Sequence, residues 1–134
     1  MLDACLQQEI VIHTDDRIGI LADVSRLLGD MGINLLTVYV RTEEASVAIH
    51  LVTTSQSYAR DALKEAGFSV EEREVILIKL PHHPGFLSRV SEALARKGIA
   101  IEELYATVPE EGRTGLVVFN TSHNGKAVQM LRGR

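Results

Sequence analysis

The chain has 134 residues, which is long enough for one ordinary domain or two very small ones. Its hydrophobic content of 46% and charged content of 24% predict a packed core rather than disorder. The net charge of -4, the 4% aromatic content and the absence of a Lys/Arg cluster argue against nucleic-acid binding. Such binding needs cations to neutralise phosphates and aromatic rings to stack on bases.

The cysteine content and the ends of the chain bear on localisation. Cys5 is the single cysteine, so neither an intramolecular disulfide nor a thiolate metal cage can form, which fits a reducing compartment. The opening segment, MLDACLQQEIV, lacks the basic and apolar regions of a secretion signal. The longest apolar run, VILIKL, is too short to span a bilayer. We therefore expect a cytoplasmic protein with no membrane partner.

The sequence contains an internal repeat. A shift of 66 positions aligns IGILADVSRLLGDMGINLLTVYV with PGFLSRVSEALARKGIAIEELYA. The residues shared by both copies are Gly19/Gly85, Leu21/Leu87, Val24/Val90, Ser25/Ser91, Leu28/Leu94, Gly32/Gly98, Ile33/Ile99 and Tyr39/Tyr105. These are positions where a backbone needs glycine or a helix needs a buried apolar side chain, so the chain reads as two copies of one small unit.

The first copy alternates strand and helix signals. Its runs of β-branched residues predict strands. Apolar residues at helical spacing begin at Ile20 and predict a helix, and Gly32 marks the expected C-terminal end of that helix. Ser55 or Ser57 is the expected N-cap of the second helix. In chain order we predict a strand over 9–13, a helix over 20–31, strands over 33–40 and 47–52 joined by a polar turn, a helix over 55–67 and a fourth strand in 68–74.

The second copy repeats this order without its last element. It predicts a strand over 75–80, a helix over 85–97, strands over 99–108 and 114–120 joined by a turn at 109–112, and a final helix over 125–134. Arg134 is the counterpart of Phe68, so no fourth strand follows. An open strand position is an edge that proteins usually cover. We expect residues 68–74, the N-terminus or a partner chain to fill it.

The predicted fold class is α+β, with two tandem ferredoxin-like βαββαβ units. Each has an antiparallel sheet with its helices on one face, and the second unit lacks its own C-terminal strand. The expected domains are residues 1–74 and 75–134. Apolar residues occur at both parities in strands 33–40 and 47–52, which predicts that both faces of this sheet are buried and that the chain associates.

The doubled motif resembles the ACT domain family over almost the whole chain. The family pattern of a glycine loop, a helix and a G-I-N strand start stands here as DRIGIL…GINL and HHPGFL…GIAI. The resemblance implies a tandem, non-catalytic ACT protein that binds an amino acid or a similar metabolite and regulates amino-acid metabolism. It also implies side-by-side pairing of domains, with ligands at the seam, and hence a homodimer.

The resemblance places ligand contacts on the first loop and on the strand after the helix. It implies that a ligand approaches Gly19, that Asp16 pairs with an ammonium group, and that Asn34 offers an amide that can donate and accept. Backbone N–H groups at the helix start attract a carboxylate. The expected ligand-binding residues are Thr14, Asp16, Ile18, Gly19, Ile20, Leu21, Asn34 and Leu35. Thr14 stands where serine-binding relatives have histidine, which argues against serine.

The second loop matches the family pattern differently. Its expected residues are His82, Pro84, Gly85, Phe86 and Leu87. Pro84 occupies the usual proline position, which Ile18 replaces in the first copy, whereas His82 stands in place of Asp16 and Ala100 in place of the asparagine. The two sites are therefore expected to be non-equivalent, with the first copy favoured for amino-acid binding.

Simpler interpretations of the same residues remain open. Gly19 and Gly85 would serve equally as tight strand-to-helix joints, Asp16 as a helix cap, and Asn34 as a partner for backbone groups at a strand start. A metal site built on the histidines His13, His50, His82, His83 and His123 lacks ligand spacing, so no metal and no cofactor are expected. No nucleophile motif is present, so no catalytic residues are expected.

The sequence therefore favours an amino-acid sensor that acts on an enzyme or regulator in trans through an assembly change. One rival is a protein-interaction module that has lost ligand binding, which the weakened second loop would fit. An enzyme of ferredoxin-like fold ranks last.

Overall fold

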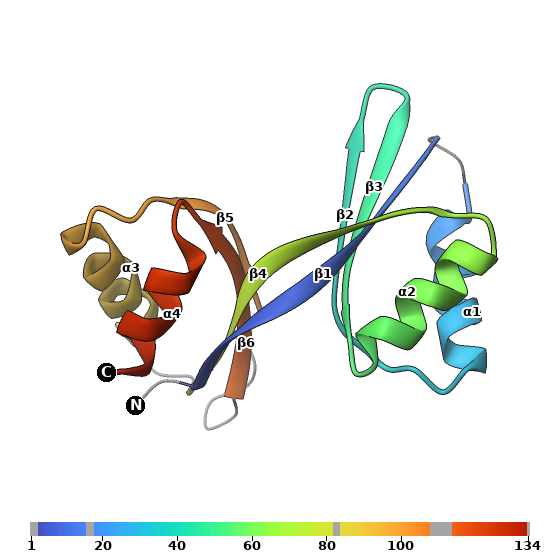
Figure 1. The fold of residues 1–134 in the computed structure, drawn as a ribbon. Helices are drawn as coiled ribbons and strands as arrows, with labels where there is room; N and C mark the ends of the chain where they lie inside the picture. The colour runs from blue at the N-terminus through green and yellow to red at the C-terminus, as the bar shows by residue number, and fades with distance from the viewer. Residues whose placement is uncertain (1–2, 16–17, 82–83, 108–113, 134) are drawn as a thin grey trace. The chain divides into compact units, whose positions relative to one another are not determined.

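The computed structural model describes residues 3–15, 18–81, 84–107 and 114–133 (Figure 1). The chain divides into two compact units. The first unit is Gln8–Arg73, and the second unit is Met1–Gln7 together with Glu74–Arg134. The described part of the chain forms, in order, β1 (Asp3–Asp15), α1 (Ile20–Asp30), β2 (Leu35–Glu43), β3 (Ser46–Thr53), α2 (Gln56–Glu65), β4 (Ser69–Pro81), α3 (Phe86–Arg96), β5 (Ile101–Ala106), β6 (Thr114–Thr121) and α4 (Asn124–Arg132).

The first unit has the predicted ferredoxin-like arrangement. Its strands lie in the order β2-β3-β1-β4, and β3 pairs antiparallel with both β2 and β1. Both helices pack on one face of this sheet, because α1 and α2 share a single buried cluster with alternate residues of β1 and β3. The cluster includes Ile10, Ile12, Val24, Leu28, Ile49, Leu51 and Leu63, all fully buried.

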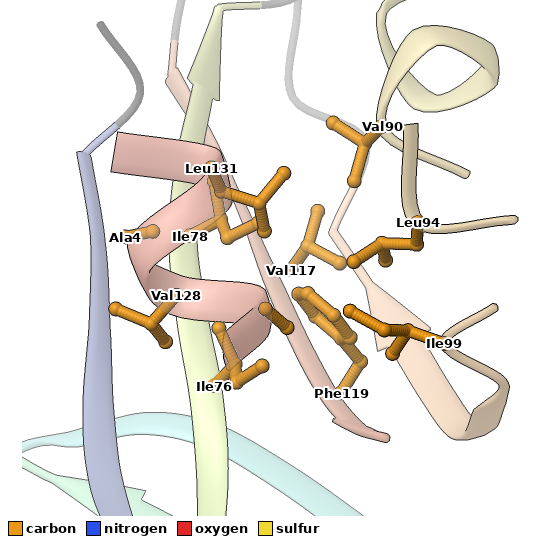
Figure 2. Close-up of a cluster of buried hydrophobic side chains, with 11 residues drawn as sticks. Ala4, Ile76, Ile78, Val90, Leu94, Ile99, Val117, Phe119, Val128 and Leu131 are labelled. Atoms are coloured by element: carbon orange, nitrogen blue, oxygen red, sulfur yellow. The ribbon is translucent and has the colours of Figure 1, made fainter. Parts of the chain in front are cut away.

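The second unit repeats this arrangement, with strand order β1-β4-β6-β5 and antiparallel pairing of β6 with β4 and β5. Its core, shown in Figure 2, joins α3 and α4 to one face of the sheet. Phe119 is the largest side chain in this core and is buried with Ile76, Ile78, Leu94 and Leu131. The predicted fold class, two α+β ferredoxin-like units with helices on one face of each sheet, is confirmed. The strands predicted separately over 68–74 and 75–80 form one continuous strand, β4, so the described chain has six strands rather than seven.

Residues 3–7 of β1 occupy the strand position that the second repeat lacks. Ala4 lies in the core of the second unit, and the Nε of Arg132 on α4 donates a hydrogen bond of 2.8 Å to the Ala4 carbonyl. β4 is likewise shared, because residues 69–73 belong to the first unit and residues 74–81 to the second. The domain boundary predicted from sequence places residues 1–74 in the first domain. The contacts within the chain instead group residues 1–7 with the second repeat.

Most predicted elements are confirmed, including the helix start at Ile20, and the helix predicted from Gly85 begins one residue later, at Phe86. Ser55 is the N-cap residue of α2, although its side chain makes no capping hydrogen bond. β1 is longer than predicted, and β2 continues to Glu43, beyond the point where a turn was expected. The turn expected at 109–112 lies outside the described residues. Among the described helices, none is long and apolar enough to cross a membrane.

The expectation that both faces of the first sheet are buried is wrong for β2. Leu36, Val38 and Val40 are 40–42% exposed. Val38 and Val40 pair with Leu51 and Ile49, so they lie on the face that carries the helices. They stay accessible because β2 is the edge strand of its sheet and the helices cover the edge less completely than the centre.

Candidate functional site

The predicted site begins at two equivalent loops, each of which ends on a glycine that starts a helix. Gly19 has φ 88° before α1, and Gly85 has φ 85° before α3. The carbonyl of Gly19 accepts the first helical hydrogen bond from the N–H of Asp23 at 3.0 Å, and that of Gly85 accepts from Arg89 at 3.1 Å. The two copies therefore build the same strand-to-helix joint.

The glycine is required by its backbone conformation rather than by close packing. A Cβ built on Gly19 or Gly85 would meet no atom of the described residues within 4 Å. A positive φ of this size favours glycine on its own. The backbone N–H groups of the first turn of α1 have no acceptor within the helix, so they suit an anionic group.

The side chains predicted around Gly19 divide into exposed and buried groups. Ile18 is fully exposed and Leu21 is 39% exposed, whereas Ile20 is buried in the core of the first unit. Thr14 is half-buried on β1, opposite Val47 of β3. Asp16 lies outside the described residues. Of these side chains, Ile18 and Leu21 are therefore the accessible apolar groups.

Asn34 precedes β2, and its backbone is held by Thr54. The Asn34 N–H donates to Thr54 Oγ1 at 3.3 Å, and the Asn34 carbonyl accepts from the Thr54 N–H at 3.0 Å. The second unit makes the same two bonds between Ala100 and Ser122, at 3.1 and 3.0 Å. Because alanine supports the same backbone, the Asn34 amide is not needed for local structure. It is exposed and makes no hydrogen bond to the described part of the chain.

The Gly19 loop and Asn34 do not meet within one unit. Asp15, just before the loop, pairs through β1 with Ser46, whereas Leu35, just after Asn34, pairs with Thr53. Ser46 and Thr53 are the two ends of β3, about 23 Å apart at the rise of an extended strand. The interpretation that the loop meets the start of the next strand is therefore corrected. A single unit places the two groups at opposite ends of its sheet.

The remaining predicted residues lie as follows. Leu35 is half-buried against the core of the first unit, and Phe86 is half-buried against the core of the second. Pro84 is exposed, and Leu87 is 44% exposed, as Leu21 is in the first copy. His82 lies outside the described residues. The described residues around Gly85 thus repeat the exposure pattern of those around Gly19, and Ala100 stands where the first copy has Asn34.

A family model described as an ACT domain pair matches residues 5–132 of the chain. The chain belongs to this family. The assignment agrees with the fold, since each ACT unit here is a four-stranded sheet with two helices on one face.

Solved structures with this fold cover almost the whole ACT pair. Protein BT0572 from Bacteroides thetaiotaomicron is 25% identical, with a TM-score of 0.88 over 97% of this chain and 89% of that one. The ligand-free regulatory subunit of aspartate kinase from Thermus thermophilus is 16% identical, with a TM-score of 0.63 over 97% and 95%. Escherichia coli aspartokinase III in complex with lysine and aspartate is 20% identical, with a TM-score of 0.52 over 97% of this chain and 32% of that one. No curated protein matches in sequence.

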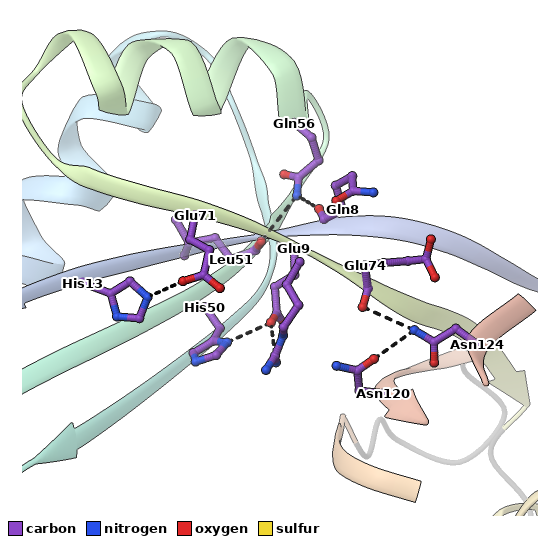
Figure 3. A network of polar contacts seen from close by, with 11 residues as sticks. Gln8, Glu9, His13, His50, Leu51, Gln56, Glu71, Glu74, Asn120 and Asn124 are labelled. Atoms are coloured by element: carbon purple, nitrogen blue, oxygen red, sulfur yellow. Dashed lines mark hydrogen bonds and ion pairs between the residues drawn. The ribbon is translucent and has the colours of Figure 1, made fainter. Parts of the chain in front are cut away.

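The first unit of the ACT pair also contains a buried ionic network, shown in Figure 3, that the sequence analysis did not identify. Glu9 on β1 is fully buried, and its Oε1 lies 2.8 Å from His50 Nδ1 and 2.9 Å from Arg73 Nη2. His50 is also in edge-to-face contact with Tyr39, at 5.4 Å between ring centroids. A buried carboxylate with two nitrogen partners is held in one position.

The second unit places apolar side chains at the positions of this network. By strand register, Val75, Val118 and Tyr105 correspond to Glu9, His50 and Tyr39. Val75 and Val118 form a buried cluster with Leu77. The fold therefore does not require the ionic network. A comparison of Glu9 with Val75 at the 66-residue shift would have identified it from sequence, because a glutamate in an apolar strand is unusual.

Proposed function

We propose that this ACT pair is a non-catalytic regulatory protein that binds an amino acid, and that each site is completed by two ACT units from different copies. The observation that carries the proposal is the separation of the Gly19 loop from Asn34 within one unit. Each group is accessible, and neither has a local structural role that uses its free polar atoms. The family membership and the fold shared with a kinase regulatory subunit support a regulatory role.

Pairing of two copies through β2 would bring the separated groups together. β2 starts beside Asn34 and ends at Glu43, which pairs with Ser46 at the loop end of the sheet. In an antiparallel pairing of β2 with β2 about a two-fold axis, the start of one strand lies beside the end of the other. Asn34 of one copy then faces the Gly19 loop of its partner, twice per dimer.

The β2 edge has the properties of such an interface. An edge strand offers unpaired backbone groups, and Leu36, Val38 and Val40 add apolar side chains that are about two-fifths exposed. Apolar side chains of this size are usually covered when they cluster. We therefore assign this edge to the homodimer.

The chemistry of the two groups favours an amino acid as ligand. The first-turn N–H groups of α1 suit a carboxylate, and the Asn34 amide can accept from an ammonium group or donate to a carboxylate. Ile18 and Leu21 beside Gly19 would contact an apolar or imidazole side chain. The aspartokinase III complex with lysine and aspartate shows that a protein containing this fold binds amino acids.

Binding would act as a switch by stabilising the paired state. A ligand that touches both copies has no complete site in a separated chain, so it shifts the population toward the dimer. The readout would be an enzyme or regulator in trans that distinguishes the two states. We also propose that the protein acts in the cytoplasm.

The test is a thermal-shift screen of the chain against the twenty amino acids, followed by titration calorimetry of the best one. Asn34→Ala should abolish the shift while leaving the melting temperature of the free protein unchanged, because Ala100 supports the same backbone in the second unit. Gln129→Ala, at an exposed α4 position, is the matched control and should bind normally. A shift that survives Asn34→Ala overturns the assigned site.

The alternative is an assembly module without a ligand, which the exposed β2 edge alone would serve. It predicts a concentration-dependent dimer that none of the twenty amino acids stabilises. This outcome would replace sensing with assembly as the function.

A further inference from the structure

A groove lies on the first unit between α1 and α2, and none of its lining residues belongs to β2. Its volume is about 380 Å³. Leu27 of α1, Met31 directly after α1, and Tyr58 and Ala62 of α2 line it, and Asp61 and Glu65 add carboxylates. Leu27 and Met31 are one helical turn apart, so they lie on one face of α1.

Two large side chains of this groove, Met31 and Tyr58, are exposed, whereas the second repeat has lysines at the equivalent positions. Met31 is 47% exposed and Tyr58 is 73% exposed. Their counterparts are Lys97, which precedes Gly98 as Met31 precedes Gly32, and Lys126, which lies two residues into α4 as Tyr58 lies two residues into α2. The second unit thus has charged side chains at these two positions, as is usual for a helix surface that faces solvent. The first unit carries methionine and tyrosine there instead.

The carboxylates make the groove acidic. Asp61 pairs with Arg60 at 3.0 Å, and Arg60 also pairs with Glu72 at 2.9 Å. Hydrogen bonds from Arg60 to Asp61, and then to Glu72, hold the pKa of the guanidinium above its ordinary value, so this cation is already engaged. Glu65 has no ion-pair partner in the described part of the chain, so a negative charge is available beside Met31 and Tyr58.

The helix layer of the second unit has the opposite charge. Among the described residues of this layer, exposed cations outnumber acids by five to one, although the chain as a whole has a net charge of -4. The cations are Arg89, Arg96, Lys97, Lys126 and Arg132, and the acid is Glu92, which pairs with Arg96. Met130 lies partly buried at the same surface, at the position of Ala62 in the groove.

We propose that the acidic α1–α2 groove of one copy binds the cationic α3–α4 layer of a second copy. The contact pairs unlike surfaces, so it is heterologous and continues from copy to copy unless it closes into a ring. Opposite charges steer the two faces together and fix their orientation, while Met31 and Tyr58 supply the apolar area. The contact is separate from the β2 edge and does not depend on a bound amino acid.

The direct test transplants the second repeat's residues into the groove. Met31→Lys with Tyr58→Lys recreates the surface that the second unit already carries, so folding should be preserved. Sedimentation velocity of the full chain should show concentration-dependent species larger than a dimer for the wild type, and at least roughly tenfold weaker association for the double variant. Self-association equal to that of the wild type, or a wild type that never exceeds a dimer, would overturn the proposal.

Charge reversal identifies the two faces. Glu65→Lys in one protein, and Lys97→Glu with Lys126→Glu in another, should each weaken self-association. Mixing the two should restore it, because each reversed face meets a compatible face on the other protein. Failure of the mixture to associate more than its components would contradict the assignment.

A β2 variant separates this contact from the proposed dimer. Val38→Lys should remove the β2 pairing and the amino-acid response but leave the helix-face association, with its salt dependence, in place. If Val38→Lys alone abolishes all association, the larger species arise from β2 and the helix-face proposal is wrong.

Discussion

Gly19 and Asn34 lie at opposite ends of helix α1, which has 11 residues and is therefore about 16 Å long. Both residues are accessible and each carries a different half of the chemistry expected of an amino-acid site. A ligand the size of an amino acid cannot bridge this distance. The ligand site proposed for this ACT pair therefore depends on association.

The β2 edge should control both assembly and ligand response. Val38 is 40% exposed, so Val38→Lys should leave the fold intact and place a charge in the proposed interface. We expect the dimer dissociation constant to rise by roughly a hundredfold, as for loss of an apolar contact near an interface centre, and the thermal shift by an amino acid to disappear. Analytical ultracentrifugation measures the first effect. Lys79→Glu, at an exposed β4 position, is the control and should change neither.

The two glycines of the loops should contribute equally to folding and unequally to binding. Gly19→Ala and Gly85→Ala each force alanine into positive φ, which should cost about 1–2 kcal/mol of unfolding free energy. Urea denaturation measures this cost. The second unit has Ala100 where the first has Asn34, so it lacks the amide of the proposed site. We therefore expect ligand affinity to fall in Gly19→Ala and to stay unchanged in Gly85→Ala, at temperatures where both proteins are folded. Equal losses of affinity would mean that both loops bind.

The buried network should show a strong asymmetry between its members. Glu9→Val leaves His50 and Arg73 without their shared carboxylate, and loss of one partner in a buried ion pair costs about 3–5 kcal/mol. His50→Val should cost no more than about 1–2 kcal/mol, because Glu9 keeps Arg73. The double variant recreates the Val75 and Val118 pair of the second unit. Chemical denaturation of the three proteins tests this order, and equal costs for the two single variants would contradict it.

Residues 3–7 should be a structural part of the second unit. Deletion of residues 1–7 removes Ala4 from the core and the hydrogen bond that Arg132 donates to its carbonyl. Hydrogen exchange should speed up first in residues 74–81 of β4 and in α4, while α1 and α2 of the first unit stay protected. Asp3→Ser, which keeps the strand, serves as control. Protection of α4 that is unchanged by the deletion would show that the segment is dispensable.

The sequence predicted the elements well because its signals are local. Gly19, Gly85 and the apolar stripes of α1 and α3 each act within one turn or one helix, and the 66-residue repeat supplied each signal twice. It also anticipated that the N-terminus was one candidate for the missing strand. It did not place residues 1–7 in the second unit, because nothing local in Ala4 or Cys5 indicates the strand beside which they lie.

The candidate site was predicted less completely, for a geometric reason. Residue types identified the Gly19 loop and Asn34, but only the strand register shows that α1 holds them apart. Glu9 was missed because a single acidic residue in a strand reads as solvent-facing until its partners His50 and Arg73 are known. The burial of Ile20 and Leu35 likewise depends on which face of each element meets the core. Because their side chains pack inward, these two residues can contribute only backbone groups to the site.

Intermolecular complementation tests the central claim most directly. Asn34→Ala removes the amide half of every proposed site, and Asp16→Ala removes the carboxylate that the ACT resemblance assigns to the ligand ammonium at the Gly19 loop, so neither protein alone should bind the amino acid that the wild type binds. After the two are mixed and allowed to exchange, each mixed dimer contains one intact site, formed by the loop of one chain and Asn34 of the other. Titration calorimetry of the mixture should then recover wild-type affinity at up to one site per mixed dimer. Mixed dimers that form but bind no ligand would contradict a site shared between copies.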